Sequence, residues 1–252
     1  MTPLDQHHDR AETVPTHAAS SSLLRHLKNK VIAPGSRSRQ IQTGPLKGLR
    51  MRLDLRHQTQ VYLGLYEREL HPWLALLGRN ALTAIDVGAA DGAYSLYFLK
   101  RTAAQSVYSF EPDAVVRERF RLNLRLNGVN DDEQRIRLFD ATAGSGQTGN
   151  SVALDSLYGS ISWPCLVKVD VEGAEVDVLS GAIRLLRHGG SSWIIETHSA
   201  ELERDCIRLL AERGLTIMVV SPAWWRFAVP EARPIAHNRW LIAYDKGALT
   251  PR

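Results

Sequence analysis

The chain contains few cysteines and no long apolar run. Only Cys165 and Cys206 occur among its 252 residues, and neither belongs to a Cys-x-x-Cys pair or stands near a histidine at the spacing of zinc ligands. This argues against a disulfide framework and fits a reducing compartment best. No stretch approaches the roughly 20 apolar residues of a membrane span, and the first residues lack the apolar core of a signal peptide. The sequence therefore predicts a cytoplasmic protein without a membrane span.

Most of the chain has no excess of positive charge, although the formal net charge is +4. Residues 1–72 hold 11 Lys and Arg against 6 Asp and Glu, whereas residues 73–252 hold 20 against 21. Because affinity for phosphates needs basic groups concentrated on the binding face, this distribution argues against a nucleic-acid partner.

Three regions follow from the composition. Residues 1–40 are predicted to form a flexible basic arm, since their first part lacks periodicity and has little apolar surface to bury. Residues 41–80 are predicted to form a hairpin, followed by one helix over 61–77, packed on the catalytic domain. Residues 81–252 are predicted to form that domain.

Apolar strands alternate with helical segments through this third region. Such alternation implies a mostly parallel sheet with helices on both faces, a doubly wound α/β fold. Ligands bind to these folds at the carboxyl ends of the strands, beside the switch in strand order. The predicted strands cover residues 81–88, 105–110, 135–139, 165–170, 192–196, 215–220 and 237–244.

A glycine loop follows the first of these strands. Asp86, Gly88 and Gly92 stand across a strand-to-helix turn, where glycine lets the backbone approach a ligand, and Ala89 belongs to the same loop. Glu111 ends the second strand, 23 residues after Gly88, close to the spacing expected for an acid that binds ribose hydroxyls. A tight turn and a capping acid explain each residue singly, but their joint placement predicts a nucleotide-type cofactor.

The same loop lacks the features of a pyrophosphate site. No glycine occupies position 90 of a GxGxxG pattern, and Asp91 at the helix N-terminus would repel a pyrophosphate. S-adenosylmethionine, which has a nucleoside, a positive sulfonium and no phosphate, suits acidic surroundings better. Asp140, at the end of the third strand, is a candidate for the adenine amino group, or else an acid that opens a surface loop.

Four carboxylates crowd the end of the fourth strand. This strand lies beside the first in a doubly wound sheet, so Asp170 and Glu172 are predicted to face the crevice of the glycine loop. Glu175 and Asp177 fall in the first turns of the next helix, where negative charge interacts favourably with the helix dipole. We therefore interpret the first pair as functional and the second as structural.

Several motifs together resemble the FkbM family of S-adenosylmethionine-dependent methyltransferases. The resemblance runs from about Ile41 to Tyr244, and KVDVEGAE followed by VLSGA is its most specific part. Two departures are AADG in place of an Asn-containing loop and a short stretch between Asp140 and Ser151. The other motifs are GPLKG, YLGLYERE, IDVGAADG, YSFEPD, SVALD and IIETHS.

The resemblance implies a seven-stranded, mostly parallel Rossmann-like sheet whose last strand is antiparallel. It also implies O-methylation of a hydroxyl on a small molecule, sugar or glycan. Asp170 and Glu172 would border the site of methyl transfer. The cofactor would be held by Asp86, Gly88, Gly92 and Glu111.

Transfer to a hydroxyl is helped by a base that removes its proton. His198 is the first candidate because its unperturbed pKa is near neutral, with Glu196 or Asp170 as the alternative. His198 could equally be a neighbour of a helix cap at Ser199. A metal bound by Asp170, Glu196 and His198 is a lesser alternative that rests on ligand type alone, and the sequence predicts no metal site.

Other readings of the chain stay open. A non-catalytic nucleoside-binding module or a nicotinamide-dependent reductase would use the same fold class. A methylase of nucleic-acid bases is disfavoured because DVEG stands where an Asn/Asp-Pro-Pro-aromatic motif is expected. Trp224 and Trp225 would cover an acceptor, pack in the core or form a homodimer contact.

Overall fold

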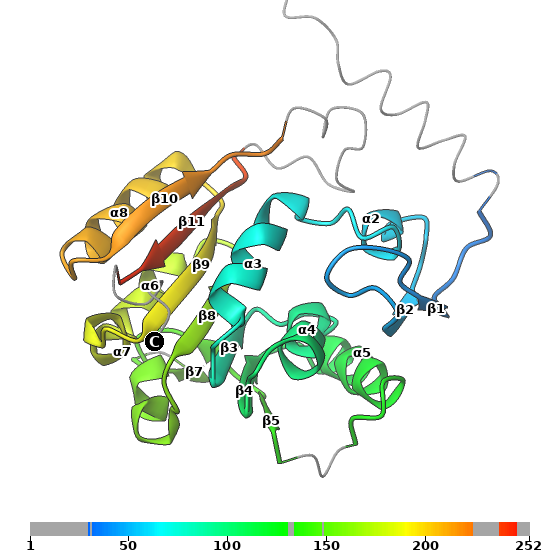
Figure 1. The fold of residues 1–252 in the computed structure, drawn as a ribbon, viewed down its shortest axis with the longest axis horizontal. Coiled ribbons are helices and arrows are strands. Elements are labelled where there is room, and N and C mark those ends of the chain that lie inside the picture. Colours follow the sequence, from blue (N-terminus) through cyan, green and yellow to red (C-terminus); the bar gives the residue numbers. More distant parts are fainter. Residues whose placement is uncertain (1–29, 31, 131–133, 148, 224–236, 246–252) are drawn as a thin grey trace, which may run out of the picture.

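A computed structural model describes residues 30, 32–130, 134–147, 149–223 and 237–245. The expectations for residues 1–22 and for Trp224 and Trp225 lie outside this part of the chain. The most extensive feature is a seven-stranded sheet flanked by helices (Figure 1). Its strands, in order across the sheet, are β10 (Thr216–Val220), β11 (Arg239–Tyr244), β9 (Ser191–Thr197), β8 (Cys165–Val169), β3 (Thr83–Val87), β4 (Ser106–Phe110) and β5 (Ile136–Phe139).

The predicted fold class is confirmed. Strands β9, β8, β3, β4 and β5 are parallel, whereas β11, the last strand, pairs antiparallel with both β9 and β10. Every residue of β3, β8 and β9 is buried, as expected for parallel strands that are covered on both faces. Each of the seven strands lies where the sequence predicts one.

Helices cover both faces of the sheet (Figure 1). On one face, the apolar sides of α3 (His71–Gly78), α4 (Ala93–Arg101) and α5 (Ala114–Arg125) share a core with alternate residues of β3, β4 and β8. The other face has a second core. That core is built by α6 (Glu175–Ser180), α7 (Ile183–Arg187), α8 (Ala200–Ala211) and the 3-10 helix η2 (Leu154–Ser160).

Two of the helices begin at side-chain caps. Asp113 accepts hydrogen bonds from the amides of Val115 and Val116, and Ser199 accepts one from the amide of Leu202. These bonds satisfy amides that the first turn of a helix leaves unpaired. Both caps directly follow strand ends, so they fix where α5 and α8 leave the sheet.

The predicted hairpin forms, but it begins four residues before the expected position. β1 (Arg37–Gln40) pairs antiparallel with β2 (Arg50–Leu53). The edge of β2 that faces away from β1 is hydrogen-bonded to a side chain of α5. Asn123 Oδ1 accepts a hydrogen bond from the backbone amide of Arg52 at 2.8 Å. The hairpin is thereby attached to α5.

The single helix expected over 61–77 is wrong. The chain instead forms α2 (Thr59–Tyr62), the 3-10 helix η1 (Arg68–Leu70) and then α3. Gly64 has a φ of +63°, and a Cβ there would lie 2.1 Å from the carbonyl oxygen of Thr43. Glu67 also has a positive φ, of 44°. The helix is interrupted because Gly64 packs closely against the hairpin loop and because Gly64 and Glu67 have left-handed backbone conformations.

One small pair of strands lies outside the large sheet. β6 (Thr142–Ala143) and β7 (Ser151–Val152) pair in parallel and hold the ends of the 144–149 loop together. Among the described residues, no helix is both long enough and apolar enough to cross a bilayer.

Candidate functional site

The carboxyl ends of three neighbouring strands meet at one edge of the sheet. Val87 of β3 is paired with Val169 of β8, and Val169 is paired with Ile195 of β9. Asp170 continues this pairing, since its amide donates to the carbonyl of Val87 at 2.9 Å. β3 lies between β4, which follows it along the chain, and β8, which comes later. The strand order reverses between β3 and β8, so their carboxyl ends mark the switch point of the sheet.

A cavity of about 380 Å³ opens at this edge, a size within the range of small-molecule sites. One wall is formed by the glycine loop and the start of α4, and the floor by the strand ends. The opposite wall comes from the hairpin and the 57–66 segment. The described residues that line it are Met51, Leu53, His57, Gln58, Gln60, Val61, Tyr66, Gly88, Ala89, Ala90, Asp91, Ala93, Tyr94, Lys168, Asp170 and Glu196.

The glycine loop follows the backbone path that its sequence requires. Gly88 has a φ of +77°, and a Cβ there would lie 1.9 Å from the carbonyl oxygen of Asp170. Gly92 has a φ of +84° and faces the Phe120 ring, which its Cβ would approach to 2.8 Å. Ala90 adopts a positive φ of 45° without being glycine. No other residue type fits at Gly88 without moving the end of β8.

Glu111 and Asp86 lie next to this loop rather than on the cavity wall. Glu111 accepts from the amide of Ala90 at 3.0 Å and from that of Asp113 at 2.9 Å, so it ties the β3–α4 loop to the β4–α5 loop. Asp86 is buried within β3 and accepts from the Ser95 hydroxyl at 2.6 Å. Burial raises the pKa of Asp86, and nearby Lys168 partly offsets that rise.

Asp140 and Glu172 are exposed and lie outside the set of residues that line the cavity. The Asp140 side chain is 69% exposed and pairs with Arg117 at 2.6 Å. Gly88, Ala89 and Asp170 are therefore the predicted cofactor residues that the structure brings to the cavity itself. Gly92 lies directly behind them as the cap of α4.

Asp91 lines the cavity but is not an isolated charge. Its carboxylate accepts from Arg119 Nε at 2.8 Å and from Gln58 Nε2 at 2.9 Å. The repulsion of a pyrophosphate expected from Asp91 is thus weakened by Arg119. The bond to Gln58 also joins the N-terminal segment to the glycine loop.

Lys168 is a buried cation at the centre of the site. Its ammonium lies 3.0 Å from Asp170 Oδ2 and 4.4 Å from the centre of the Tyr94 ring. Burial by itself lowers the pKa of Lys168, but the surrounding carboxyl groups, Asp170 first and then Glu67, outweigh it and raise that pKa. Lys168 in turn holds the pKa of Asp170 below its usual value, against the effect of burial.

Glu67 belongs to this cluster although it comes from the interrupted helix. It is 1% exposed and accepts a hydrogen bond from the Tyr94 hydroxyl. Burial raises the pKa of Glu67. Sequence reasoning missed this residue, yet a signal was present: in the predicted helix, Glu67 falls on the apolar stripe of Leu63, Leu70 and Leu74.

Glu196, near the end of β9, is 5% exposed. Burial raises its pKa to about 10, and the negative charges of Asp170 and Glu67 act in the same direction. At neutral pH Glu196 is therefore a carboxylic acid that can donate a hydrogen bond, beside an ionised Asp170. Two carboxyl groups in different protonation states thus face one cavity.

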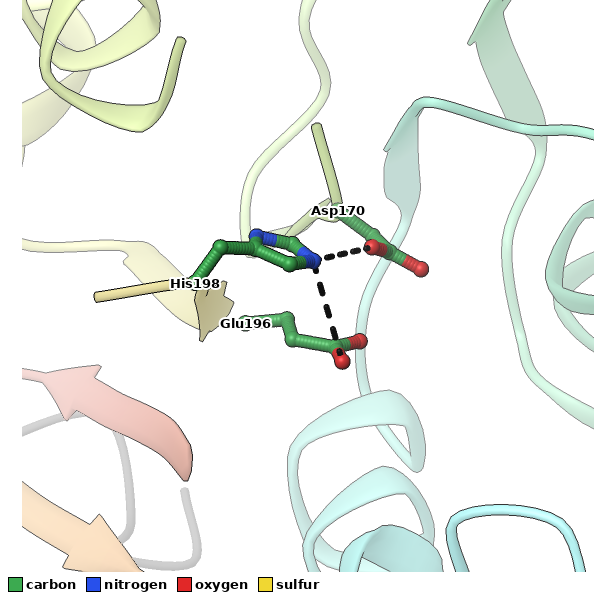
Figure 2. Close-up of side chains that lie close together, drawn as sticks. All are labelled: Asp170, Glu196 and His198. Carbon is green, nitrogen blue, oxygen red and sulfur yellow. Dashed lines mark ion pairs between the residues drawn. The ribbon is translucent and has the colours of Figure 1, made fainter. Parts of the chain in front are cut away.

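The His198 ring lies beside these two carboxyl groups, with its Nε2 turned toward both (Figure 2). Its Nδ1 is 2.5 Å from Glu175 Oε1, while its Nε2 is 3.8 Å from Asp170 Oδ1 and 3.9 Å from Glu196 Oε1. The hydrogen bond to Glu175 raises the pKa of His198, against the effect of burial. His198 is close to the predicted partners, but the described residues that line the cavity do not include it.

Glu175 lies in the first turn of α6, as predicted, but it is also fully buried and bonded to His198. Asp177, in the same turn, stays exposed. Asp170 and Glu175 thus both lie beside His198, whereas Glu172 is exposed. The division into functional and structural acids stays a prediction.

No family model matches the chain, and no curated protein matches it. Among solved structures, methyltransferase FkbM from Methylobacillus flagellatus KT aligns with a TM-score of 0.51 at 20% identity, over 65% of this chain and 44% of that one. The METTL16 methyltransferase domain aligns with a TM-score of 0.50 at 14% identity, over 72% and 68% of the two chains. The chain therefore shares the fold of these two methyltransferases. The chain spans less than half of the FkbM protein that it resembles.

Proposed function

We propose that the chain is an S-adenosylmethionine-dependent methyltransferase related to the FkbM family and that it methylates a hydroxyl group. The observation that carries this proposal is the cavity at the switch point, where the close-packed Gly88 loop faces Asp170 and Glu196. Such sheets bind nucleoside cofactors at this place.

Gly88 and Ala89 would lie against the cofactor, with Gly92 setting the direction of α4. Asp86 and Glu111 would position the glycine loop without touching the cofactor. Asp86 accepts a hydrogen bond from the Ser95 hydroxyl, and Glu111 accepts one from the amide of Ala90. Asp140 and Glu172 remain candidates for the outer end of the cofactor. When bound, S-adenosylmethionine supplies an electrophilic methyl group.

The acceptor would lie between the strand ends and the N-terminal wall formed by Leu53, Gln58 and Tyr66. Asp170 and Glu196 are the groups on the floor that can touch its hydroxyl, one ionised and one protonated. In this arrangement Asp170 accepts the hydroxyl proton, and His198 acts through Asp170 instead of touching the acceptor. Holding the oxygen in line with the methyl group can remove as much as about 7 to 11 kcal/mol of the barrier.

A small molecule, sugar or glycan is the acceptor class we propose. The hairpin and 57–66 segment contribute mixed apolar and amide side chains to the wall, and the catalytic region has no net positive charge for a phosphate backbone. A cytoplasmic location and a homodimer stay predictions from the sequence.

Calorimetry of the full chain with S-adenosylmethionine and with NAD tests the cofactor. We expect binding of the first and none of the second; tight NAD binding alone would favour a reductase. Transfer of a labelled methyl group to an extract, followed by mass spectrometry, then identifies the acceptor.

Asp170→Asn tests whether Asp170 accepts the proton of the acceptor hydroxyl. We expect transfer to fall by about 10²- to 10⁴-fold, the usual contribution of a general base. Asp205→Asn, on the exposed side of α8, is the matched control and should transfer normally. Full activity of Asp170→Asn would contradict the assignment.

A further inference from the structure

We propose that Asp170, Glu196 and His198 form a binding site for one divalent transition-metal ion. One ligand atom from each residue lies within 4.8 Å of the others. The three residues come from the end of β8, the end of β9 and the loop before α8, and their side chains converge on one point (Figure 2). Binding of the ion does not depend on methyl transfer, so this inference stands apart from the proposed function.

His198 is prepared as a ligand. Its Nε2 is buried, has no hydrogen-bond partner among the described residues, and lies between the two carboxyl groups at 3.8 and 3.9 Å. Its Nδ1 is held by Glu175, whose side chain is fully buried. In the neutral imidazole, a proton on Nδ1 would be donated to Glu175 Oε1, and Nε2 would present its lone pair to an ion. Histidines that bind metals usually have this kind of carboxylate partner behind them.

Asp170 is also oriented. Lys168 Nζ bonds its Oδ2 at 3.0 Å, which leaves Oδ1 turned toward His198. The Lys168 ammonium is itself fixed over the Tyr94 ring. The cation therefore neutralises one side of Asp170 without occupying the oxygen that faces the imidazole.

The site is open on one side. Asp170 and Glu196 both line the cavity, so an ion held by the three residues would keep positions free toward a bound molecule. Catalytic metal sites commonly combine three protein ligands with such open positions. A structural site would instead be closed by a fourth side chain.

The ligand types indicate which ions fit. One imidazole and two carboxylates suit Mn²⁺, Fe²⁺, Co²⁺ or Zn²⁺, whereas Mg²⁺ prefers oxygen ligands alone. Glu196 would release its proton to solvent when it binds the ion. Bonds of about 2.0 to 2.2 Å bring the donors of one ion closer than they lie here. Small rotations of the carboxyl groups would close this gap.

If the proposed function holds, the ion would lie where the acceptor hydroxyl is expected. A coordinated hydroxyl loses its proton more readily, because the positive charge stabilises the oxygen anion. His198 would then be a ligand of the ion and not the base that the sequence analysis favoured.

Titration of chelator-treated full-length protein with Mn²⁺ tests the site. The electron paramagnetic resonance signal of free Mn²⁺ reports binding, and calorimetry with Zn²⁺ and Mg²⁺ ranks the ions. We expect one Mn²⁺ per chain and weaker binding of Mg²⁺. Glu175→Gln should weaken Mn²⁺ binding by about 10- to 100-fold, the usual effect of altering the hydrogen-bond partner of a metal-binding histidine. His198→Ala should weaken it by at least that much.

His188→Ala is the matched control, since this histidine stacks on Trp163 with ring centres 3.6 Å apart, away from the cavity residues. It should bind Mn²⁺ as the unaltered chain does. Circular dichroism checks that each variant is folded. If His198→Ala does not fold, the Mn²⁺ affinity of Glu175→Gln decides whether the metal site exists. Failure to bind one ion, or equal affinity in the folded variants, would overturn the metal site. Binding of S-adenosylmethionine, measured separately, would leave the proposed function standing.

Discussion

Single buried charges determine how this site is built. Lys168 is 1% exposed, and its ammonium interacts with four carboxyl groups, namely Asp170, Glu67, Asp86 and Glu196. A buried charge is tolerated only where partners and hydrogen bonds compensate for its lost hydration. The lysine therefore stabilises the cluster as a whole, and its loss leaves acids without a counter-charge.

Lys168→Met tests this role because it keeps an unbranched apolar chain and removes the charge. We expect the free energy of unfolding to fall by about 3 to 5 kcal/mol, the usual cost of removing one partner of a buried pair. Urea denaturation followed by circular dichroism measures it. Lys47→Met, at an exposed position, should change it by no more than about 0.5 kcal/mol. A similarly small loss for Lys168→Met would show that the acids are stable without the cation.

The position of a residue, though not its role, could be predicted where it follows from the residue's place at the end of a strand. Gly88, Ala89 and Asp170 lie on the cavity because the carboxyl ends of neighbouring strands share one edge. Glu67 and Glu175 could not be assigned in this way, because their burial depends on contacts with Tyr94 and His198 that are distant in sequence. The predicted roles of Asp86, Glu111, Asp140 and Glu172 stay predictions.

At the scale of elements, the interrupted helix is what brings Glu67 to the site. Seven strands and most helices could be predicted since their apolar periodicity is local. The break at 63–67 could not, because it results from packing against the hairpin loop. Gly64 packs against the backbone of Thr43 so closely that a Cβ would lie 2.1 Å from the Thr43 carbonyl oxygen.

Gly64→Ala and Gly214→Ala form a matched pair for this contact. Both glycines have positive φ, of +63° and +77°, but a Cβ at Gly214 meets no described atom within 4 Å. We expect Gly214→Ala to cost about 1 to 2 kcal/mol of the free energy of unfolding, the backbone strain alone. Gly64→Ala should cost more, because its methyl group also displaces the Thr43 backbone. Equal losses in urea denaturation would mean that the hairpin contact contributes nothing.

At the scale of the whole molecule, one sheet connects two separate cores with the cavity at its edge. The N-terminal segment closes that cavity through the Gln58 to Asp91 bond, and α5 anchors the hairpin through Asn123. The doubly wound architecture could be predicted from strand and helix alternation alone. The shape of the cavity could not be predicted, since seven of its sixteen described lining residues come from outside the predicted catalytic region.

The two thiols report whether this architecture opens as one unit. Cys165 is in β8 and Cys206 in α8, and both are free and buried in the same core. Burial raises the pKa of Cys206 to about 12 and raises that of Cys165 further, so neither is a thiolate at pH 8. We expect a thiol reagent to modify neither in the native chain. If the core unfolds cooperatively, both should react over the same urea range in which circular dichroism is lost. Earlier labelling of Cys206 alone would mean that α8 separates from the sheet before the strands do.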